Sequence, residues 1–315
     1  MSLRVAVQMD PMESIAIAGD SSFALMLAAQ ARGHRLHHYL APHLSYADGR
    51  VRAQARGVQV RAQPGDHFEH GEWETLDLAD DVDVVLMRQD PPFDLSYITA
   101  THLLERVQPW TLVVNDPASV RNAPEKLFVL DYARFMPPTL ITRSLEETRA
   151  FQAEHGDIVV KPLYGNAGSA VFKIGRDGGN LSALTELFNH VWVEPFMVQA
   201  FLPAVAEGDK RIVLIDGKAS GAINRLPGKG EIRSNLAAGG RAEATELTAR
   251  EQEICDALGP ELARRGLLFV GIDVIDGFLT EINVTSPTGI VAIDRFNGTD
   301  TPGLIWDAIE AKRRA

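Results

Sequence analysis

Residues that could hold a metal ion lie close together near the C-terminal end of the chain, between Gly271 and Pro287. Two apolar runs joined across Asp276-Gly277 predict a β-hairpin. Because side chains alternate along a strand, Glu281 and Asn283 should point to the same face. Carboxylate and amide oxygens suit Mg²⁺, which completes its shell with water and substrate phosphates. The pattern indicates a nucleotide-using enzyme; the alternative is that these side chains only cover the solvent face of an antiparallel pair.

The position of Asp273 depends on the turn. A simple two-residue loop would pair Ile275 with Phe278 and place Asp273 on the face away from Glu281. A three-residue loop, or a bulge with Gly277 in a left-handed conformation, pairs Asp273 with Glu281 and puts both carboxylates on one face. We predict the second arrangement.

Two glycine-containing segments could contact phosphates. Residues 158–162 predict a buried strand that carries Lys161, and Gly165-Asn166-Ala167-Gly168-Ser169 follows; its glycines let backbone N–H groups approach phosphate oxygens closely. The alternative is an ordinary tight hairpin. Residues 226–241 are rich in glycine, carry three cations and show no apolar period. We interpret them as a mobile lid that grips anionic ligands, with a plain surface loop as the alternative.

The first ~120 residues alternate strands and helices. The pattern predicts strands at 4–9, 34–40, 82–88 and 111–115, with a helix capped by Asp20 or Ser21 and another at 97–107. We therefore expect an open parallel sheet with helices on its faces. Ligands of such sheets bind beyond the carboxyl ends of the strands, where Arg88 and Asp90 fall. The first strand is not followed by G-x-G-x-x-G, so dinucleotide binding has no support. From about Pro124 the pattern becomes mixed and hairpin-rich.

Composition limits the function further. A chain of 315 residues predicts two or three domains or subdomains. A formal net charge of -11 argues against nucleic acid and membrane partners. The single cysteine, Cys255, excludes an intrachain disulfide, and its helical-looking surroundings predict a buried, inert thiol. The first residues run directly into a strand without a leader pattern, so we expect a cytoplasmic protein.

Eight sequence blocks, in this order, resemble those of the bacterial glutathione synthetases, members of the ATP-grasp superfamily. The resemblance extends from residue 5 to about residue 311. The blocks are Met9-Asp10-Pro11, Asp20-Ser21-Ser22-Phe23, Met87–Asp94, Glu125-Lys126-Leu127, Val160–Leu163, Gly208–Arg211, Asn235–Arg241 and Leu279–Pro287.

The resemblance implies an α/β plus α+β chain: an ATP-grasp fold preceded by an open parallel-sheet, Rossmann-like domain. It implies an N-terminal substrate-binding domain at 1–122, a central flap subdomain at 123–200 and a C-terminal subdomain at 201–315 with the lid and the metal site. The implied activity joins γ-glutamylcysteine to glycine through an acyl phosphate, with ATP as co-substrate and release of ADP and phosphate. Mg²⁺ is the implied metal, with Mn²⁺ as the alternative, and a homo-oligomer is expected.

Site residues follow from the same resemblance. Arg211 matches the arginine that stabilises the oxyanion of the tetrahedral intermediate, with a structural ion pair as the alternative. Lys126 matches a phosphate-binding lysine, with a solvated helix charge as the alternative. The metal ligands are expected at Asp273, Glu281 and Asn283. The ATP-binding residues are expected at Lys126, Lys161, Gly165, Gly168, Ser169, Gln199, Ala200, Phe201, Leu202 and Asp209. The substrate and lid residues are expected at Arg88, Asp90, Arg233, Asn235, Gly240, Arg241, Ser286 and Thr288.

Two other functions fit the same fold. The first is another carboxylate–amine ligase, of the D-alanine–D-alanine or glutamate ligase type; the blocks at 87–94 and 235–241 favour glutathione synthesis. The second is a non-catalytic ATP-binding module similar to synapsin, against which the retained metal and lysine positions argue. The chain departs from the family pattern at Ala167, where paired glycines are expected, and at Val291, where a polar or basic residue is expected.

Overall fold

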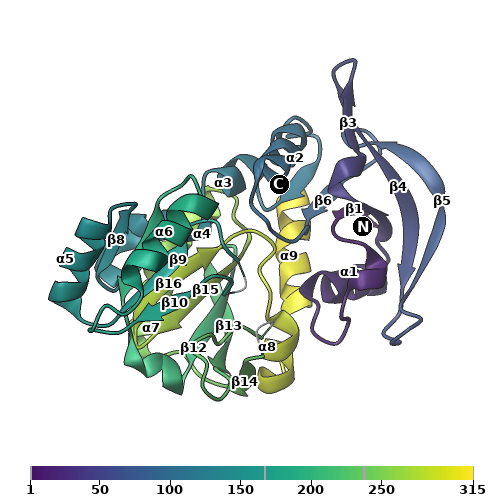
Figure 1. The fold of residues 1–315 in the computed structure, drawn as a ribbon. Helices are drawn as coiled ribbons and strands as arrows, with labels where there is room; N and C mark the ends of the chain where they lie inside the picture. Colours follow the sequence, from purple (N-terminus) through teal and green to yellow (C-terminus); the bar gives the residue numbers. More distant parts are fainter. Residues whose placement is uncertain (1, 167, 237–238, 315) are drawn as a thin grey trace.

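The computed structural model describes residues 2–166, 168–236 and 239–314, and these residues form three β-sheets with helices packed on them (Figure 1). Ala167 in the glycine-containing segment and Ala237–Ala238 in the lid lie outside the described residues. Each sheet corresponds to one stretch of the chain, and the sheets follow one another in sequence.

The first sheet contains the predicted parallel strands in the order β2-β1-β6-β7. Asp20 caps the first helix, because its side chain accepts a hydrogen bond of 2.6 Å from the backbone nitrogen of Phe23. The two helices pack on opposite faces, since their buried residues belong to different core clusters. These elements are β1 (Arg4–Gln8), α1 (Ser21–Ala31), β2 (Arg35–Tyr39), β6 (Val84–Met87), α2 (Leu95–Glu105) and β7 (Leu112–Val114).

An antiparallel extension widens this sheet and was not among the predicted elements. The strands β3 (Leu44–Ala47), β4 (Arg50–Val60) and β5 (Phe68–Asp77) follow β2, and β4 and β5 form a long curved hairpin at the outer edge (Figure 1). A register shift between Arg56 and Val58 interrupts the alternation of β4. The first sheet is therefore mixed, with a parallel centre.

The second sheet is antiparallel, in the order β10-β9-β11-β8, and it contains the predicted strand that carries Lys161. Helices α5 and α6 pack against it around a separate apolar cluster. The elements are β8 (Thr139–Thr142), α5 (Leu145–His155), β9 (Ile158–Pro162), β10 (Phe172–Ile174), α6 (Leu181–Val191) and β11 (Phe196–Ala200).

The third sheet, β14-β13-β12-β15-β16, is also antiparallel and carries all three residues predicted for the metal site. Helix α7 contains Cys255, which is buried as expected, and burial raises the pKa of its thiol to about 12. The elements are β12 (Asp209–Ile215), β13 (Lys218–Leu226), β14 (Arg241–Ala244), α7 (Ala249–Arg264), β15 (Phe269–Ile275) and β16 (Phe278–Asn283).

The β15–β16 hairpin pairs Asp273 with Glu281, as predicted, but by a different route. Ile275 pairs with Phe278 across a two-residue turn, so the predicted three-residue loop or bulge at Gly277 is wrong. A register shift after Asp273 then leaves Thr280 as the extra residue of a bulge. The bulge lies within the strands rather than in the turn, and it restores the two carboxylates to one face.

The last helices return to the first sheet. Trp306 of α9 (Thr301–Arg314) is completely buried, and its Nε1 donates a hydrogen bond of 2.8 Å to the carbonyl of Leu25 in α1. Asn115, at the end of β7, donates through Nδ2 to the carbonyls of Phe269 and Val284 at 2.7 and 2.9 Å. The first and third sheets are therefore joined through buried contacts, with α9 lying between them in Figure 1.

Short helices complete the chain. They are η1 (Met12–Ser14), η2 (Ala41–His43), α3 (Pro117–Arg121), α4 (Glu125–Phe128), η3 (Val129–Phe135), η4 (Pro203–Glu207) and α8 (Ile290–Asn297). Within the described ranges, none of the helices is long and apolar enough to cross a membrane.

Candidate active site

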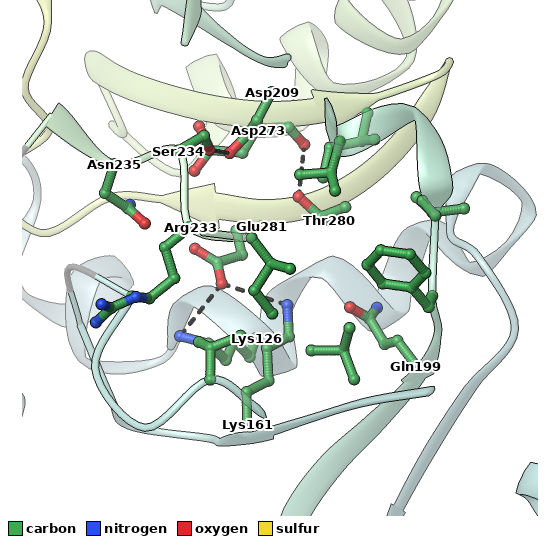
Figure 2. A pocket seen from close by; sticks show the side chains of 18 of the residues that line it. Lys126, Lys161, Gln199, Asp209, Arg233, Ser234, Asn235, Asp273, Thr280 and Glu281 are labelled. Atoms are coloured by element: carbon green, nitrogen blue, oxygen red, sulfur yellow. Dashed lines mark hydrogen bonds and ion pairs between the residues drawn. The ribbon is translucent and has the colours of Figure 1, made fainter. Parts of the chain in front are cut away.

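Two lysines from different elements converge on one carboxylate between the second and third sheets. Lys126 lies on α4 and Lys161 on β9, and the Nζ of each is 3.4 Å from Oε1 of Glu281 on β16 (Figure 2). Lys126 is only 3% exposed, so the interpretation of this residue as a solvated helix charge is wrong. The Nζ of Lys126 also donates a hydrogen bond of 2.7 Å to the carbonyl of Gly165.

The electrostatics of this trio favour an incoming anion. Burial lowers the pKa of Lys161, and the charge of Lys126 lowers it further, against the effect of Glu281. Burial acts in the same direction on Lys126, but Glu281 and Glu125 outweigh it and raise the pKa of that lysine. Burial opposes ionisation of Glu281, yet the two lysines hold its pKa below the usual range. Burial raises the pKa of the neighbouring Glu125, so the two lysines share mainly the charge of Glu281 and can attract phosphate oxygens.

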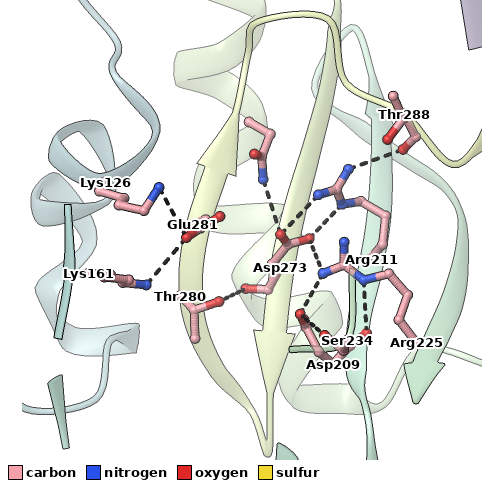
Figure 3. A network of polar contacts seen from close by, with 11 residues as sticks. Lys126, Lys161, Asp209, Arg211, Arg225, Ser234, Asp273, Thr280, Glu281 and Thr288 are labelled. Atoms are coloured by element: carbon pink, nitrogen blue, oxygen red, sulfur yellow. Dashed lines mark hydrogen bonds and ion pairs between the residues drawn. The ribbon is translucent and has the colours of Figure 1, made fainter. Parts of the chain in front are cut away.

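A second cluster of charges surrounds Asp273. Arg211 of β12 donates to both carboxylate oxygens, from Nε at 2.5 Å and Nη2 at 2.9 Å, and Arg225 of β13 approaches to 3.0 Å (Figure 3). Burial would raise the pKa of Asp273, but the two guanidinium groups hold it well below its usual range. Asp273 is 3% exposed, so the solvent-face alternative for this hairpin is wrong. The bidentate contact also shows that Arg211 takes part in a structural ion pair.

A cavity enclosing about 880 Å³, here called the hinge cavity, opens beside the lysines. Its apolar walls could hold a planar ring; they include Val159, Val171, Leu202, Val205, Ile232 and Ile275. All ten residues predicted to bind ATP line it: Lys126, Lys161, Gly165, Gly168, Ser169, Gln199, Ala200, Phe201, Leu202 and Asp209.

Asp209 is suited to bind a hydroxyl group in the hinge cavity. Its Oδ2 accepts from Arg225 Nη2 at 2.6 Å and from Ser234 Oγ at 2.7 Å. Its Oδ1 is buried and, among the described residues, has no hydrogen-bond partner. An unsatisfied buried carboxylate oxygen costs free energy unless a ligand donates to it, so a ribose hydroxyl fits here.

A second cavity, here called the Ser286 cavity, adjoins the first. The two cavities share Asn166, Asn235 and Glu281. The second is lined by Asp90, Arg211, Arg225, Asn283, Ser286 and Thr288, among others. Its walls therefore combine cations and carboxylates with hydroxyl and amide groups, which suits a ligand that carries both carboxylate and amine groups.

Three of the predicted substrate and lid residues belong to the described part of the chain but line neither cavity. Arg88 donates to Ser22 Oγ at 2.9 Å and to the carbonyl of Pro287 at 3.0 Å, so it braces the loop that contains Ser286. Arg241 is solvent-exposed and pairs with Glu243 at 2.8 Å. A Cβ on Gly240 would lie 2.0 Å from the carbonyl oxygen of Ser234, so this glycine permits a close backbone approach within the lid.

The other lid residues close over the hinge cavity. Arg233 and Asn235 line it, and a Cβ on Gly168 would lie 2.6 Å from Oδ1 of Asn235 (Figure 2). The lid and the described residues 164–166 and 168–169, here called the flap, are therefore in contact over the lysines. This contact favours the lid interpretation of residues 226–241 over a plain surface loop.

Arg225 was not predicted from the sequence as a residue of the site. It is 4% exposed and bridges Asp209 and Asp273. The available signal was a cation inside the apolar strand pattern 222–226. Its partner could be recognised only once the β12–β13 register pairs Asp209 with Arg225.

The residues predicted to bind a metal fit Mg²⁺ by their chemistry. Asp273 and Glu281 are carboxylates on one face, and Asn283 donates from Nδ2 to Asp273 Oδ2 at 3.3 Å, so the three side chains converge. Across the described residues, His, Cys, Asp and Glu form no group of three that could hold an ion. Two carboxylates and one amide would supply the protein ligands of such an ion, and phosphate oxygens and water would supply the others.

Comparison with known proteins agrees with this geometry. The prokaryotic glutathione synthetase N-terminal domain model matches residues 3–121, and the prokaryotic glutathione synthetase ATP-grasp domain model matches residues 125–298. A glutathione synthetase from Rhodopseudomonas palustris is 58% identical over 99% of this chain and 100% of its own length. One from Agrobacterium fabrum is 57% identical over 99% and 97%, respectively. The crystal structure of a D-cycloserine synthetase shares the fold, with a TM-score of 0.70 at 17% identity over 98% of this chain and 99% of that one.

The fold and the two adjoining cavities thus define an ATP-grasp enzyme, an ATP-dependent carbon–nitrogen ligase. Within that class, the chain belongs to the prokaryotic glutathione synthetase family.

Proposed function

We propose that the two cavities divide the reactants of glutathione synthesis between them, with ATP in the hinge cavity and γ-glutamylcysteine and glycine in the Ser286 cavity. One observation carries this assignment: the cavities meet at Glu281, Asn166 and Asn235. A γ-phosphate between Lys126 and Lys161 would then face a carboxylate bound on the other side of Glu281. Transfer between two anions needs close positioning and neutralised charge, which these residues supply.

The proposed reaction has two steps. The cysteine carboxylate of γ-glutamylcysteine attacks the γ-phosphorus of ATP, and the bond to the β–γ bridging oxygen breaks, giving an acyl phosphate and ADP. The amine nitrogen of glycine then attacks the acyl carbon; phosphate leaves, and the nitrogen loses a proton. Mg²⁺, or Mn²⁺ in its place, would be held by Asp273, Glu281 and Asn283 and would neutralise phosphate charge.

The chain's own residues have distinct parts in this proposal. Lys126 and Lys161 hold the phosphates, and the flap with Gly165 and Gly168 covers them. Arg211, whose Nη1 donates to the carbonyl of Thr288 at 3.1 Å, is directed at the Ser286 cavity, where an oxyanion would develop. The pairing of Arg211 with Asp273 keeps the guanidinium in place, so the structural and catalytic roles are compatible.

The experiment is a coupled assay of ADP release in which γ-glutamylcysteine and glycine are each omitted in turn. We expect full turnover only with both, and glutathione by mass spectrometry. ADP release supported by D-alanine or glutamate in place of these substrates would favour the other ligase types. Nucleotide binding without turnover on any amine would favour the non-catalytic module.

We also propose the division into domains at 1–122, 123–200 and 201–315. The three sheets support these limits, since their strands lie within residues 4–114, 139–200 and 209–283. Limited proteolysis should cut first near the proposed boundaries or in the lid at 226–241. Cleavage inside a sheet would contradict the division.

Small-molecule substrates, a cytoplasmic location and a homo-oligomeric state complete the proposal. ATP and a thiol dipeptide are both available in a reducing cytoplasm, and the buried Cys255 needs no oxidising compartment. Sedimentation velocity of the purified chain would measure the oligomeric state. A single species at the monomer mass would contradict the proposed homo-oligomer.

A further inference from the structure

An aromatic stack joins the first domain to the flap. The rings of Phe93 and Tyr164 lie 6.2 Å apart between centroids and are nearly parallel, with an interplanar angle of 12°. Phe93 belongs to the loop between β6 and α2, here called the 88–94 loop, and also packs against Tyr97 of α2 at 5.4 Å. Tyr97 is 2% exposed, so Phe93 rests on a fixed support.

The same loop forms part of the proposed dipeptide site. Asp90 and Pro91 line the Ser286 cavity. The carbonyl of Gln89 accepts a hydrogen bond of 2.6 Å from Ser286 Oγ, and the backbone nitrogen of Asp90 donates to Asp10 Oδ2 at 2.8 Å. A ligand that orders Asp90 and Pro91 therefore also orders Phe93, two residues further on.

On the other side of the stack, Tyr164 is directly followed by Gly165. The carbonyl of Gly165 holds Lys126, and a Cβ at this position would lie 2.6 Å from Cγ of Pro162, so the backbone here is tightly placed. Fixing the Tyr164 ring thus fixes the start of the flap above the phosphate-binding lysine. Tyr164 itself is 38% exposed, and Phe93 is the ring stacked on it.

We propose that Phe93 and Tyr164 are positioning residues that couple occupancy of the Ser286 cavity to closure of the flap over the nucleotide. Dipeptide binding orders the 88–94 loop, Phe93 then holds Tyr164, and Tyr164 holds the flap across Lys126. By reciprocity, bound nucleotide tightens the dipeptide site to the same degree. The inference rests on the cavity assignments proposed above.

The test is isothermal titration of a non-hydrolysable ATP analogue with Mg²⁺, with and without saturating γ-glutamylcysteine. The ratio of the two dissociation constants is the coupling factor. We expect a factor above one for the wild type and a decrease of about threefold to tenfold in Tyr164→Ala, the size of effect that an aromatic pair contributes. Tyr164→Phe keeps the ring and should keep the coupling. The affinity for the analogue alone should change less, and the KM for the dipeptide should rise more than kcat falls.

The matched control is Phe172→Ala, which removes a ring of similar exposure from β10, the strand that follows the flap. It should leave the coupling factor unchanged. Phe93→Leu should behave as Tyr164→Ala does, and the double variant should lose no more than either single one, because both remove one contact.

Any of the following results in the variants would overturn the inference: an unchanged coupling factor in Tyr164→Ala, an equal loss in Phe172→Ala, or additive losses in the double variant. A wild-type coupling factor of one would overturn it as well. Wild-type protein that binds neither the analogue nor the dipeptide would instead overturn the cavity assignment, so the two failures are distinguishable.

Discussion

Glu281 and Arg211 present opposite charges toward the proposed reaction centre, and their substitution should separate metal binding from chemistry. Glu281→Gln keeps the shape but removes one negative charge, so Mg²⁺–nucleotide binding should weaken and turnover should collapse. Arg211→Ala should lower turnover by on the order of 10²–10³ with a smaller effect on substrate binding, as expected for loss of an oxyanion donor.

The measurement is turnover as a function of Mg²⁺ concentration. Extra Mg²⁺ should partly rescue Glu281→Gln and leave Arg211→Ala unimproved. Glu243→Gln, on the exposed β14, is the control and should titrate like the wild type. Equal rescue of both active-site variants would mean that their roles are wrongly assigned. Because Arg211 pairs with the buried Asp273, we also expect Arg211→Ala to cost about 3 kcal/mol of stability.

How far single residues could be predicted depended on whether their partners were near in sequence. Asp273, Glu281 and Asn283 share one hairpin, so the alternation of strands was enough to bring them together. The contact between Lys126 and Glu281 spans 155 positions and came only from resemblance to a family. Neither strand alternation nor resemblance to a family pointed to Arg225. Its carboxylate partners, Asp209 and Asp273, become its neighbours only through the register of three strands.

At the scale of elements, the lid offers a test in which its two arginines should differ. Arg233 lines the hinge cavity, whereas Arg241 is exposed at the start of β14. Arg233→Ala should lower turnover more than Arg241→Ala, and neither should change the melting temperature without ligand, since solvated loop side chains contribute little to stability. A melting temperature many degrees lower in either variant would show that its arginine is structural and contradict the lid interpretation.

Histidines from β2 and β5 hold the turn that follows β1, and their titration should affect stability. The Nδ1 of His38 is 3.2 Å from the Nε2 of His70, and its Nε2 is 3.2 Å from the carbonyl of Asp10. Burial, reinforced by His70 and opposed by the Asp10 carbonyl and Glu13, lowers the pKa of His38 to about 4.

The direction of the pH effect on stability follows from the unfolded chain, in which histidine titrates near 6.5. The unfolded chain therefore takes up a proton before the folded chain does as the pH falls. The stability contributed by His38 is thus present above pH 6.5 and is lost between about 6.5 and 4. Urea unfolding should show that protonation of His38 lowers the free energy of unfolding by about 2 kcal/mol between pH 7 and pH 5. In His38→Gln this contribution to the pH dependence should be absent. His102→Gln, on the surface of α2, should keep the wild-type difference. An unchanged difference in His38→Gln would contradict the prediction.

Elements were predicted where one pattern dominated. The parallel strands and the helix capped by Asp20 were found within a few residues of their expected limits. The β4–β5 hairpin was not predicted, because a bulge breaks the alternation of β4 and β5 has only one buried residue, Leu76. The bulge of the β15–β16 hairpin was predicted in the turn at Gly277, whereas the structure has it at Thr280. The pairing of Asp273 with Glu281 can be deduced from the sequence, but the position of the extra residue depends on packing.

At the scale of the whole molecule, the buried Trp306 should control the stability of both ends of the chain. The apolar cluster around it includes Val5 of the first sheet and Val213 of the third. Trp306→Ala should therefore cost about 3–5 kcal/mol while leaving a single unfolding transition. Trp110→Ala, which removes a largely exposed ring, should stay within about 0.5 kcal/mol of the wild type.

The measurement is urea unfolding followed by circular dichroism and by tryptophan fluorescence. Coincident transitions are expected in both variants. Two separated transitions after Trp306→Ala would show that the first sheet and the ATP-grasp part unfold independently. That result would contradict the prediction that the apolar cluster around Trp306 makes them unfold together.

The return of α9 to α1 also bears on synthesis of the chain. Domains are generally completed in the order in which they leave the ribosome. Here the apolar face of α1 is covered by Trp306, which is synthesised 281 positions after its hydrogen-bond partner Leu25. Arg32, the residue that follows α1, likewise pairs with the distant Asp307, at 2.8 Å. The first sheet should therefore remain open to proteases in stalled nascent chains that end at residue 298. Protection should appear only when α9 has emerged, so the N-terminal domain should mature after the ATP-grasp part has been synthesised; early protection would contradict this order.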